Sequence, residues 1–319
     1  MPRLDEDSFT ELVAPYRHEL QVHCYRLLGS FEDAEEALQD TLLSVWRHHD
    51  DFEGRSSIRT WLYRIATNRC LDHLRAGRRA PVGTPLRREP PPPESSGEVP
   101  WLQPYPDDLL APDPADVVEA REAISLAYVR ALQMLPPRQR VVLVLRDVLR
   151  FQASEVAQIL ETTEESVTSA LKRARATLKV ERPLEPPPPP RSARERRIVE
   201  AWVDAFAVLD IPRMVDLLTE DSWLRMPPLP FEYHGREAAA RFFTAMSNGA
   251  REDRIIHARA NGQPAYAAYG RDPLTGLWHC KGLFVLALAG DRVHEVTRFE
   301  PAVAALAGLP RTLNSGRRP

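Results

Sequence analysis

The stretch from Leu135 to Lys179, LPPRQRVVLVLRDVLRFQASEVAQILETTEESVTSALKRARATLK, contains two short helix patterns joined by a tight polar junction. Val156, Ile159 and Leu160 give the first helix an apolar side. A threonine, Thr162, stands three residues before Glu165, a spacing typical of a capping box at the start of a new helix. The stretch therefore predicts a helix-turn-helix, whose second helix can enter a DNA major groove.

The second helix of this motif separates an apolar face from a polar one. Its inward residues, at helical spacing, are Val167, Leu171, Ala174 and Leu178. Its outward residues, which a major groove would meet, are Ser166, Thr168, Ser169, Lys172, Arg173 and Arg175. A plain surface helix with a solvated basic face has the same spacing, so the pattern alone leaves both interpretations open.

The composition limits which kinds of DNA-binding protein fit. With 319 residues the chain is long enough for two or three domains with apolar cores. Its formal net charge of -3 argues against a protein that coats nucleic acid, because such proteins need excess cationic charge to neutralise phosphates. DNA binding is therefore expected to be local, weak alone, or assisted by a partner.

Neither a membrane span nor a secretory signal is expected. The chain has no apolar run of about eighteen residues, and its first residues, MPRLDED, are acidic. Cys24, Cys70 and Cys280 are odd in number and widely spaced, which disfavours disulfides and a zinc site. We expect a cytoplasmic protein with reduced structural cysteines and without a metal or cofactor.

Residues 9–76 are predicted to be helical throughout. A long amphipathic helix is expected to bury Ala34, Ala37, Leu38, Thr41, Leu42, Val45 and Trp46. Its opposite face carries Asp33, Glu36, Gln39 and Asp40 near the helix start, where carboxylates suit the positive end of the helix dipole. Ordinary solvation of a charge cluster is the alternative interpretation.

Residues 52–75 combine an apolar side with aromatic and cationic groups. Thr60, Tyr63, Arg64 and Thr67 are predicted to share an exposed surface, opposite Ile58, Leu62 and Ile65. Aromatic rings stack on unpaired bases and guanidinium groups hold phosphates, so this surface favours single-stranded or melting DNA. Trp61 borders the apolar side, and a core tryptophan and a wedge between bases fit its position equally.

Two proline-rich linkers divide the chain, at residues 79–116 and 183–193. Within the first, Trp101 to Leu110 (WLQPYPDDLL) is too aromatic and apolar for a spacer, so we expect it to dock onto this protein or onto a partner. The second contains five consecutive prolines, which as polyproline II span roughly 15 Å. A helix predicted within residues 117–135 and the helix-turn-helix form the domain between them, at residues 117–182.

The part beyond the second linker, residues 194–310, mixes helices with strands. Helices are predicted at residues 198–206, 214–218 and 236–246, and strands at residues 223–226 and 265–269. Residues 282–289 and 292–299 read as a long antiparallel hairpin around the turn Gly290-Asp291. Helices segregated from an antiparallel sheet indicate an α+β domain.

The two helical domains resemble the extracytoplasmic-function sigma factors, the small promoter-recognition subunits of bacterial RNA polymerase. The segment from Asp33 to Trp46, DAEEALQDTLLSVW, is similar to the region-two helix that grips the polymerase clamp. Residues 52–74, with TWLYRIATNR from Thr60, resemble the segment that melts and reads the -10 element. Residues 135–178 resemble region four, whose recognition helix reads the -35 element.

The resemblance implies a transcription initiation factor that is not an enzyme, with core RNA polymerase (clamp and flap regions) and promoter DNA as partners. It implies polymerase contacts at Asp33, Glu36, Gln39 and Asp40. It implies -10 contacts at Phe52, Arg55, Ser56, Thr60, Trp61, Tyr63, Arg64 and Asn68. It implies -35 contacts at Ser166, Thr168, Ser169, Lys172, Arg173 and Arg175. Family recognition helices carry basic residues where this chain has Thr168 and Ala170, so fewer phosphate contacts are expected there.

The C-terminal domain resembles the SnoaL-like or NTF2-like cone fold, on its helical start, LLTEDS from Leu217, YHGR from Tyr233 and the closing hairpin. The implied fold class is multidomain, with all-α domains at residues 9–78 and 117–182 followed by an α+β cone at residues 194–310. Candidate cone-lining residues are Arg225, His257, Tyr266, Tyr269, His279 and Arg298. The cone is expected to be empty or to hold a small-molecule ligand, because the sequence has no nucleophile and base at a telling spacing.

Two other classes of function stay open at this point. One is a helix-turn-helix regulator that works without polymerase, which would have no use for the acidic face within residues 33–49. The other is a SnoaL-type enzyme with a DNA-binding appendage, which would need a base hydrogen-bonded to a second polar group inside the cone. For the sigma factor interpretation, we expect the tethered C-terminal domain to regulate the other two in cis.

Overall fold

The computed structural model describes residues 6–49, 52, 56–77, 90–93, 102–110, 123–178, 185–247 and 253–314. Contacts divide the chain into two units. The helical unit comprises Met1–Arg79 and Ala111–Glu181, and the sheet unit comprises Ala80–Leu110 and Arg182–Pro319. The described parts of both predicted helical domains therefore pack together, whereas those of the first linker belong to the sheet unit.

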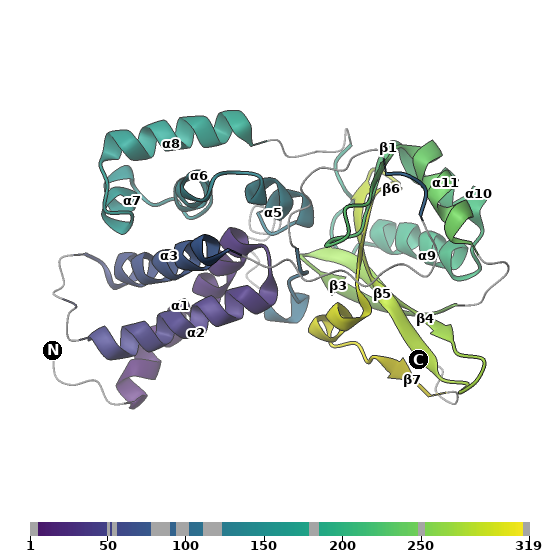
Figure 1. Ribbon diagram of the computed structural model, residues 1–319, viewed down its shortest axis with the longest axis horizontal. Helices are drawn as coiled ribbons and strands as arrows, with labels where there is room; N and C mark the ends of the chain where they lie inside the picture. The colour runs from purple at the N-terminus through teal and green to yellow at the C-terminus, as the bar shows by residue number, and fades with distance from the viewer. Residues whose placement is uncertain are drawn as a thin grey trace. The chain divides into compact units, whose positions relative to one another are not determined.

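The helices of the helical unit form two layers (Figure 1). One layer contains α1 (Glu6–Leu28), α2 (Phe31–His48) and α3 (Ile58–Ala76). The other contains α5 (Leu126–Gln133), α6 (Pro137–Leu143), α7 (Ala153–Ile159) and α8 (Glu164–Thr177). Helix α1 contacts α5 and α6, and α3 contacts α6 and α7, so the layers are packed against each other.

Local sequence signals fix the ends of α2 and α3. Ser30 caps α2 and Ser57 caps α3, and each hydroxyl accepts a hydrogen bond from the amide three residues on, at 3.2 and 3.0 Å. Gly77 ends α3 with a φ of 73°, a left-handed conformation in which a side chain is disfavoured. The helix boundaries of this layer follow from these three residues.

The predicted helix-turn-helix is confirmed as α7 and α8. Val156 and Ile159 of α7 and Val167 and Leu171 of α8 are buried, as the helical spacing predicted. Leu178, predicted to point inward, is half-buried at the end of α8.

The capping of these two helices differs from the prediction. Thr163, not Thr162, caps α8, and its hydroxyl accepts a hydrogen bond from the Ser166 amide at 3.2 Å. The capping box is found at the start of α7 and not of α8. There the Glu155 carboxylate accepts a hydrogen bond from the Gln152 amide at 2.7 Å. Thr162 and Thr163 are adjacent, and the sequence alone does not decide which of the two caps α8.

The sheet unit is built on one mixed sheet with the strand order β2-β1-β6-β5-β4-β3. The strands are β1 (Leu218–Arg225), β2 (Glu232–His234), β3 (Asp253–Ala260), β4 (Gln263–Arg271), β5 (Trp278–Ala289) and β6 (Arg292–Phe299), and β7 (Thr312–Leu313) pairs with the start of β5. Strand β1 runs parallel to β6, and the other described pairings are antiparallel. Short 3-10 turns lie at Asp107–Leu109 (η2) and Pro301–Ala307 (η4).

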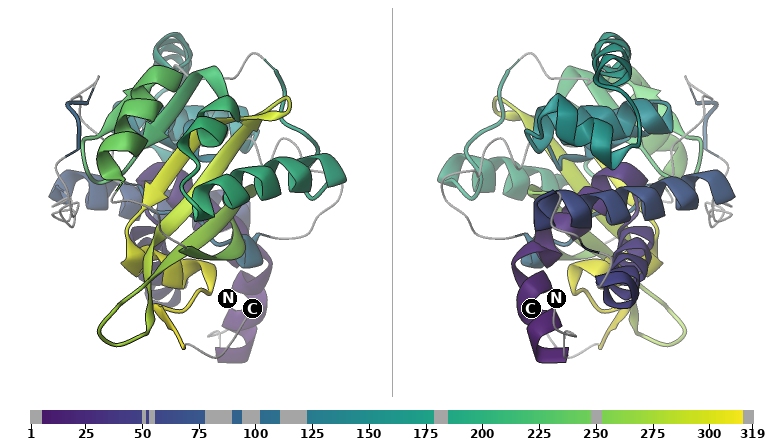
Figure 2. Two further views of the ribbon diagram at one scale, coloured as in Figure 1. Left: turned by 90° about the vertical axis from the view of Figure 1, so that its right-hand side faces the viewer. Right: turned by 90° about the vertical axis from the view of Figure 1, so that its left-hand side faces the viewer.

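Three helices cover one face of this sheet (Figures 1 and 2). They are α9 (Ala193–Ala207), α10 (Ile211–Asp216) and α11 (Arg236–Met246). Their apolar sides and the sheet enclose an aromatic core that includes Trp202, Phe206, Phe242, Tyr266 and Phe284. The Trp202 indole donates to the Tyr266 hydroxyl at 2.9 Å, so these two buried polar groups satisfy each other.

The predicted closing hairpin is present. Strands β5 and β6 pair from Leu283 and Phe299 to Ala289 and Arg292, around a turn at Gly290. Strand β3 had no prediction, because its sequence DRIIHARA has neither clear alternation nor an uninterrupted apolar run. Helix α5 fills the last part of the helix predicted within residues 117–135, of which residues 117–122 lie outside the described residues.

Two further expectations can be compared with the described part of the chain. None of its helices is long and apolar enough to cross a membrane. No group of three or more His, Cys, Asp or Glu side chains there is arranged to hold a metal ion. Cys24, Cys70 and Cys280 are free thiols, the first two buried and the third half-buried.

A buried histidine links the stability of the helical unit to pH. His23 of α1 is fully buried, and its Nε2 lies 3.0 Å from the Thr67 hydroxyl of α3. Burial, followed by the positive charges of Arg26 and Arg59, lowers the pKa of His23 to about 3. The ring is therefore neutral in the folded chain at every pH above that value.

We expect the helical unit to lose stability as the pH falls below about 6.5, the ordinary histidine pKa. Between there and pH 3 the unfolded state binds a proton at His23 that the folded state does not, so this residue lowers the unfolding free energy by about 1.4 kcal/mol per pH unit. Hydrogen exchange of α1 amides across this range measures the effect. A His23→Gln variant should lack this part of the slope, and an identical slope in the variant would contradict the assignment.

Candidate polymerase and promoter interfaces

The predicted polymerase-binding residues lie on α2. Glu36, Gln39 and Asp40 are exposed, and Asp33 is half-buried near the start of the helix. Leu43, three residues beyond Asp40, is 51% exposed, so an apolar side chain continues this acidic face. The polymerase contacts predicted from the sequence did not include Leu43, although the helical spacing had already left it off the predicted core face.

The end of α2 corrects the predicted core face. Trp46 is 40% exposed rather than buried, and its ring meets Phe9 of α1 edge-on with 5.1 Å between the centroids. Leu42 is half-buried. The buried stripe of α2 is thus narrower at this end than the apolar spacing indicated.

Helix α3 turns several predicted -10 residues inward. Thr60 and Trp61 are 3% and 5% exposed, and Tyr63 is fully buried. Thr67 is fully buried as well, so the prediction that Thr60, Tyr63 and Thr67 share an exposed surface with Arg64 is wrong. Trp61 packs against half-buried Phe52 with 5.2 Å between the ring centroids, which favours the core interpretation of this tryptophan.

The remaining predicted -10 residues are more accessible. Arg64 and Asn68, one helical turn apart on α3, are both exposed. Ser56 is half-buried just before the helix, and Arg55 lies outside the described residues. The structure therefore keeps Arg64 and Asn68 together on the surface and separates them from Thr60 and Tyr63.

Phe151, two residues before α7, packs against the buried -10 candidate Tyr63. Its ring is 3% exposed and meets the Tyr63 ring edge-on with 5.0 Å between the centroids. The Arg59 guanidinium lies over both rings, 4.5 Å from the Phe151 centroid and 5.0 Å from that of Tyr63. Arg59 also pairs with Glu19 of α1 at 3.2 Å, which holds the cation in place.

A polar contact lies beside this aromatic cluster. The Thr60 hydroxyl donates to the Glu155 carboxylate at 3.3 Å, so a predicted -10 residue is bonded to the first helix of the helix-turn-helix. Desolvation at this boundary strongly raises the pKa of Tyr63, which therefore stays a neutral phenol. We refer to the contacts of Phe151 and Glu155 with Arg59, Thr60 and Tyr63 as the α3–α7 contact.

A buried arginine joins the same two layers at another place. Arg140 of α6 is 5% exposed and donates to the Leu27 carbonyl near the end of α1. It also donates to the Gln133 side chain at 2.6 Å and to the Leu135 carbonyl at 3.2 Å. The Gln133 amide in turn donates to the Arg26 carbonyl at 3.2 Å. Backbone groups at the ends of α1 and α5 are thereby tied to α6.

The recognition helix α8 remains open to solvent. The six predicted -35 residues, Ser166, Thr168, Ser169, Lys172, Arg173 and Arg175, are all exposed. The Thr168 hydroxyl donates to the Glu164 carbonyl at 2.9 Å and is partly engaged by its own helix. The packing that covers part of α3 thus leaves the outer face of α8 accessible.

Arg175 forms an ion pair within the helical unit. Its guanidinium binds Asp147 through two hydrogen bonds of 2.6 and 2.9 Å, and the pair raises the arginine pKa. Asp147 lies in a π-helical turn, Val144–Val148 (η3), that continues α6. The ion pair positions the last turn of α8, and it competes with any DNA phosphate for Arg175.

The candidate cone-lining residues do not meet in one place. Tyr266 belongs to the aromatic core, whereas Arg225 follows the core residue Leu224 and pairs with Glu232 and Glu295. The Tyr269 hydroxyl donates to the Pro310 carbonyl at 2.7 Å, and burial raises its pKa to about 12.

The other three cone candidates are His257, His279 and Arg298. His257 is exposed on β3, and His279 is 48% exposed beside Asp272. Arg298 donates to the Lys281 carbonyl at 2.8 Å, and burial lowers its pKa.

In the strand register His257 pairs with Tyr266, and Phe284 pairs with both Tyr266 and Arg298, so these three candidates share one face of the sheet. Arg225 pairs with Thr297 and lies on the other face.

The helical unit matches two parts of one protein family. Residues 12–80 match Sigma-70 region 2, and residues 125–178 match Sigma-70, region 4. The chain is 42% identical over 321 residues to the ECF RNA polymerase sigma factor SigG of Mycobacterium tuberculosis, covering 96% of this chain and 85% of SigG. It is 28% identical over 183 residues to the ECF RNA polymerase sigma factor SigW of Bacillus subtilis, covering 55% of this chain and 89% of SigW.

Solved structures agree with the fold. The extracytoplasmic function sigma factor SigJ of M. tuberculosis aligns over 96% of this chain and all of its own, with a TM-score of 0.60 and 21% identity. An NTF2-like protein of Burkholderia xenovorans aligns over 37% of this chain and 99% of its own, with a TM-score of 0.27 and 18% identity. The predicted fold class, two helical sigma regions followed by an α+β domain, is confirmed.

A Sigma-70 region 2 followed by a region 4 helix-turn-helix defines a promoter-recognition subunit of RNA polymerase. The chain belongs to the extracytoplasmic-function (ECF) family of RNA polymerase sigma factors. Members of this family are transcription factors, not enzymes, and bind core RNA polymerase and promoter DNA. The resemblance seen in the sequence is thereby confirmed.

Replacing Phe151 with alanine is expected to uncover the inner residues of α3. The variant loses an aromatic pair and a cation–π contact, together worth about 1 to 2 kcal/mol, so amides of residues 59–63 should exchange roughly 10-fold faster. Hydrogen exchange measures this directly. Phe9→Ala, which removes an aromatic ring packed on Trp46 instead, is the matched control. Unchanged exchange at residues 59–63 in Phe151→Ala would contradict the α3–α7 contact.

Proposed function

We propose that this sigma factor binds the polymerase clamp through the exposed face of α2, formed by Glu36, Gln39, Asp40 and Leu43. Three polar or acidic residues beside an exposed leucine suit a partner surface that is basic and partly apolar. Region 4 would meet the flap region of the polymerase. A sigma factor acts where the polymerase acts, so we place this chain in the bacterial cytoplasm.

We propose that α8 reads the -35 duplex and that α3 binds the -10 strand only after the helical unit opens. The observation that carries this proposal is the burial of Thr60 and Tyr63 beneath Phe151. A base cannot stack on Tyr63 while Phe151 occupies its ring. Region 4 must therefore move away from α3, whereas the outer face of α8 is available beforehand.

We further propose that the NTF2-like domain regulates this opening in cis by holding the linker between regions 2 and 4. Residues 102–106 of that linker are buried in the sheet unit. The Tyr105 amide donates to the Asn261 side chain, and the Asn261 amide donates to the Tyr105 carbonyl, both at 2.9 Å. This reciprocal pair fixes the linker backbone at the turn between β3 and β4.

An acidic side chain strengthens the same attachment. Asp107 accepts a hydrogen bond from the Gly262 amide at 2.7 Å and another from the Arg259 guanidinium at 3.3 Å. Arg259 also pairs with Glu195 near the start of α9 at 2.6 Å. We call the contacts of Tyr105 and Asp107 with Asn261, Gly262 and Arg259 the linker clasp.

The linker clasp limits how far the two DNA-binding regions can separate. Elements named -10 and -35 are roughly 85 Å apart on B-form DNA at about 3.4 Å per base pair. Each linker residue held on the sheet unit shortens the free tether by up to about 3.5 Å. Because the domain is covalently attached, even a weak contact is occupied at an effective concentration on the order of millimolar. The clasp therefore favours the closed helical unit.

Replacing Asp107 with alanine is expected to raise transcription from a cognate promoter by purified core polymerase. The change removes the two carboxylate acceptors that Asp107 contributes to the linker clasp. A loss of about 1.4 kcal/mol would release the linker 10-fold more often. Run-off assays at limiting sigma factor should show a several-fold increase. Asp108→Ala is the control, because this neighbouring carboxylate is exposed.

Two results of that assay would count against cis regulation. Equal output from the wild type, Asp107→Ala and a chain lacking residues 186–319, at every polymerase concentration, would leave the NTF2-like domain without a regulatory role. Lower output from Asp107→Ala than from Asp108→Ala would mean that the clasp supports initiation and does not restrain it.

Replacing Lys172 and Arg173 together with alanine is expected to weaken initiation that depends on the -35 element. Each contact to a base edge is worth about 1 to 3 kcal/mol, so promoter affinity should fall at least 10-fold. Arg175→Ala should cost less, because Asp147 already binds that guanidinium. Quantitative footprinting on promoters with and without a -35 element measures the difference. An equal loss on both promoters would show that α8 does not read sequence.

A further inference from the structure

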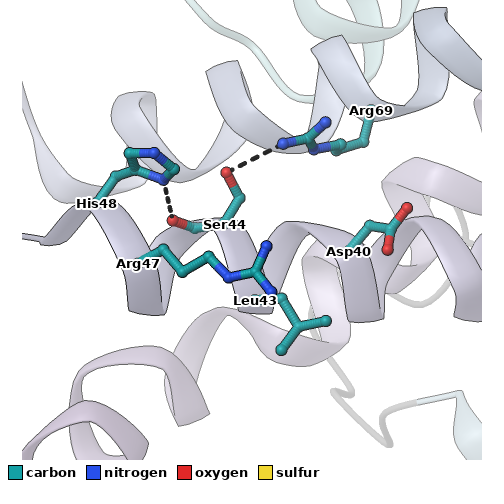
Figure 3. Close-up of a pocket in the computed structure, with 6 residues that line it drawn as sticks. All are labelled: Asp40, Leu43, Ser44, Arg47, His48 and Arg69. Atoms are coloured by element: carbon teal, nitrogen blue, oxygen red, sulfur yellow. Dashed lines mark hydrogen bonds between the residues drawn. The ribbon is translucent and has the colours of Figure 1, made fainter.

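The small pocket between α2 and α3 belongs to the proposed polymerase-binding face of α2 (Figure 3). Its lining consists of Asp40, Leu43, Ser44, Arg47, His48 and Arg69. Asp40 and Leu43 are already part of that face, and Arg69 donates a hydrogen bond of 3.3 Å from α3 to the Ser44 hydroxyl of α2. The pocket therefore continues the same face and is not a separate site.

The run of five prolines before α9 is bound to the sheet unit. The Pro186 carbonyl accepts a hydrogen bond of 3.1 Å from the amide of Gly290, at the turn between β5 and β6. Pro188, in the middle of the run, is buried. The described part of the second predicted linker is thus a second point at which the sheet unit holds a linker. We call the attachment of residues 186–192 the proline attachment.

A tight turn joins the proline run to α9. The Ser192 amide donates to the Pro189 carbonyl at 3.1 Å, and Arg191 within this turn has a φ of 59°. A left-handed φ is disfavoured for a residue with a side chain, so the turn depends on support from outside. The buried Glu195 carboxylate gives that support by accepting a hydrogen bond of 2.9 Å from the Arg191 amide.

Arg259 of β3 contacts both the proline attachment and the linker clasp. Its Nη1 donates to the Glu195 carboxylate at 2.6 Å, and its Nε donates to the Asp107 carboxylate at 3.3 Å. The remaining nitrogen, Nη2, donates to the Gly262 carbonyl at 2.8 Å. The Arg259, Asp107 and Glu195 side chains are only 19%, 10% and 7% exposed, so solvent screens these ion pairs weakly.

One guanidinium therefore serves two carboxylates that belong to different attachments. The group is planar, so an acceptor that fixes its orientation also aligns it for the other acceptors. Loss of Asp107 would let the guanidinium turn and would weaken its bond to Glu195. Loss of Arg259 would take a cationic partner from two largely buried carboxylates, which is costly for both attachments.

The two attachments flank region 4 in the chain. The linker clasp precedes α5, which begins at Leu126, and the proline attachment follows α8, which ends at Thr177. While the proline attachment holds, residues 178–185 are the tether after α8, at most about 28 Å long. Its release adds residues 186–192 and up to about 25 Å. Effective concentration falls as a flexible tether lengthens, so an opened linker clasp would then reform less readily.

We propose that Arg259 couples the linker clasp to the proline attachment, so that the segments before and after region 4 release from the sheet unit together. The inference rests on the proposed function, because an effect on transcription requires that the linker clasp restrain initiation. The coupling itself lies within the sheet unit and is measured without polymerase or DNA.

Hydrogen exchange in the full-length chain reports each attachment separately. The Gly290 and Ser192 amides report the proline attachment, and the Asn261 and Gly262 amides report the linker clasp. Asp107→Ala changes only the linker clasp directly. It should nevertheless speed exchange at both amides of the proline attachment by at least about 2-fold, because residues that share a partner are coupled.

Two variant backgrounds test whether this effect passes through Arg259. In an Arg259→Gln chain, Asp107→Ala should no longer change exchange at the two amides of the proline attachment. A Glu195→Ala chain gives the same comparison at the Gly290 amide if Arg259→Gln does not fold. Thermal unfolding of each variant establishes that it is folded.

Arg254→Gln is the matched control. Arg254 is an arginine of the same strand, and its guanidinium lies over the Trp278 ring, 4.3 Å from the centroid. This variant should leave exchange at all four reporter amides unchanged. Faster exchange there would mean that any loss of charge from β3 loosens the attachments, which would contradict a specific role of Arg259.

Exchange and transcription separate the inference from the proposed function. If Asp107→Ala speeds exchange only at the linker clasp, the coupling is rejected, whatever the run-off assay shows. If the coupling is present but Asp107→Ala and Arg259→Gln both transcribe like the wild type, the coupling stands and cis regulation is rejected. Support for both requires that Arg259→Gln raise run-off transcription more than Asp107→Ala does, because it loosens both attachments.

Discussion

Arg140 satisfies backbone carbonyls at the ends of two helices that belong to different sigma regions. The last turn of a helix leaves carbonyl groups unpaired and carries a partial negative charge, so a guanidinium is the group best suited to join two such ends. Arg140 donates to Leu27 at the end of α1 and to Gln133 and Leu135 at the end of α5. Because the Arg140 guanidinium is buried, its charge would be costly in the closed packing without these carbonyl acceptors. The closed helical unit depends on this arrangement more than on any exposed ion pair.

The closed packing affects the two DNA-binding helices unequally. Thr60 and Tyr63 face inward and are covered by Phe151, whereas Lys172 and Arg173 stay in solvent. The proposed opening would therefore expose these two α3 residues without changing the outer face of α8. An equilibrium of that kind responds to any contact that differs between the closed and open forms, including a contact made outside the helical unit.

The sheet unit supplies such a contact through the linker. At Tyr105 the backbone amide donates to Asn261 and the backbone carbonyl accepts from it. The attachment therefore depends on the conformation of the β3–β4 turn, in which Asn261 has a φ of 58°. The aromatic core beneath is filled by Trp202 and its neighbours, and Tyr266 is the one predicted cone residue that belongs to this cluster. The described contacts of this domain with the linker lie at the β3–β4 turn.

The sequence by itself determined the local elements and the family. Apolar spacing defined α2, α7 and α8, and two strand patterns around a Gly-Asp turn defined the β5–β6 hairpin. These signals are short-range, because each depends on residues within one or two turns. Only the tertiary structure decided that Thr60 and Tyr63 face Phe151, that Asp107 meets Arg259, and that Arg47 and Arg69 share a pocket. Each of these contacts joins residues that lie far apart in the chain or on separate helices, and helical periodicity cannot specify which neighbour covers a given face.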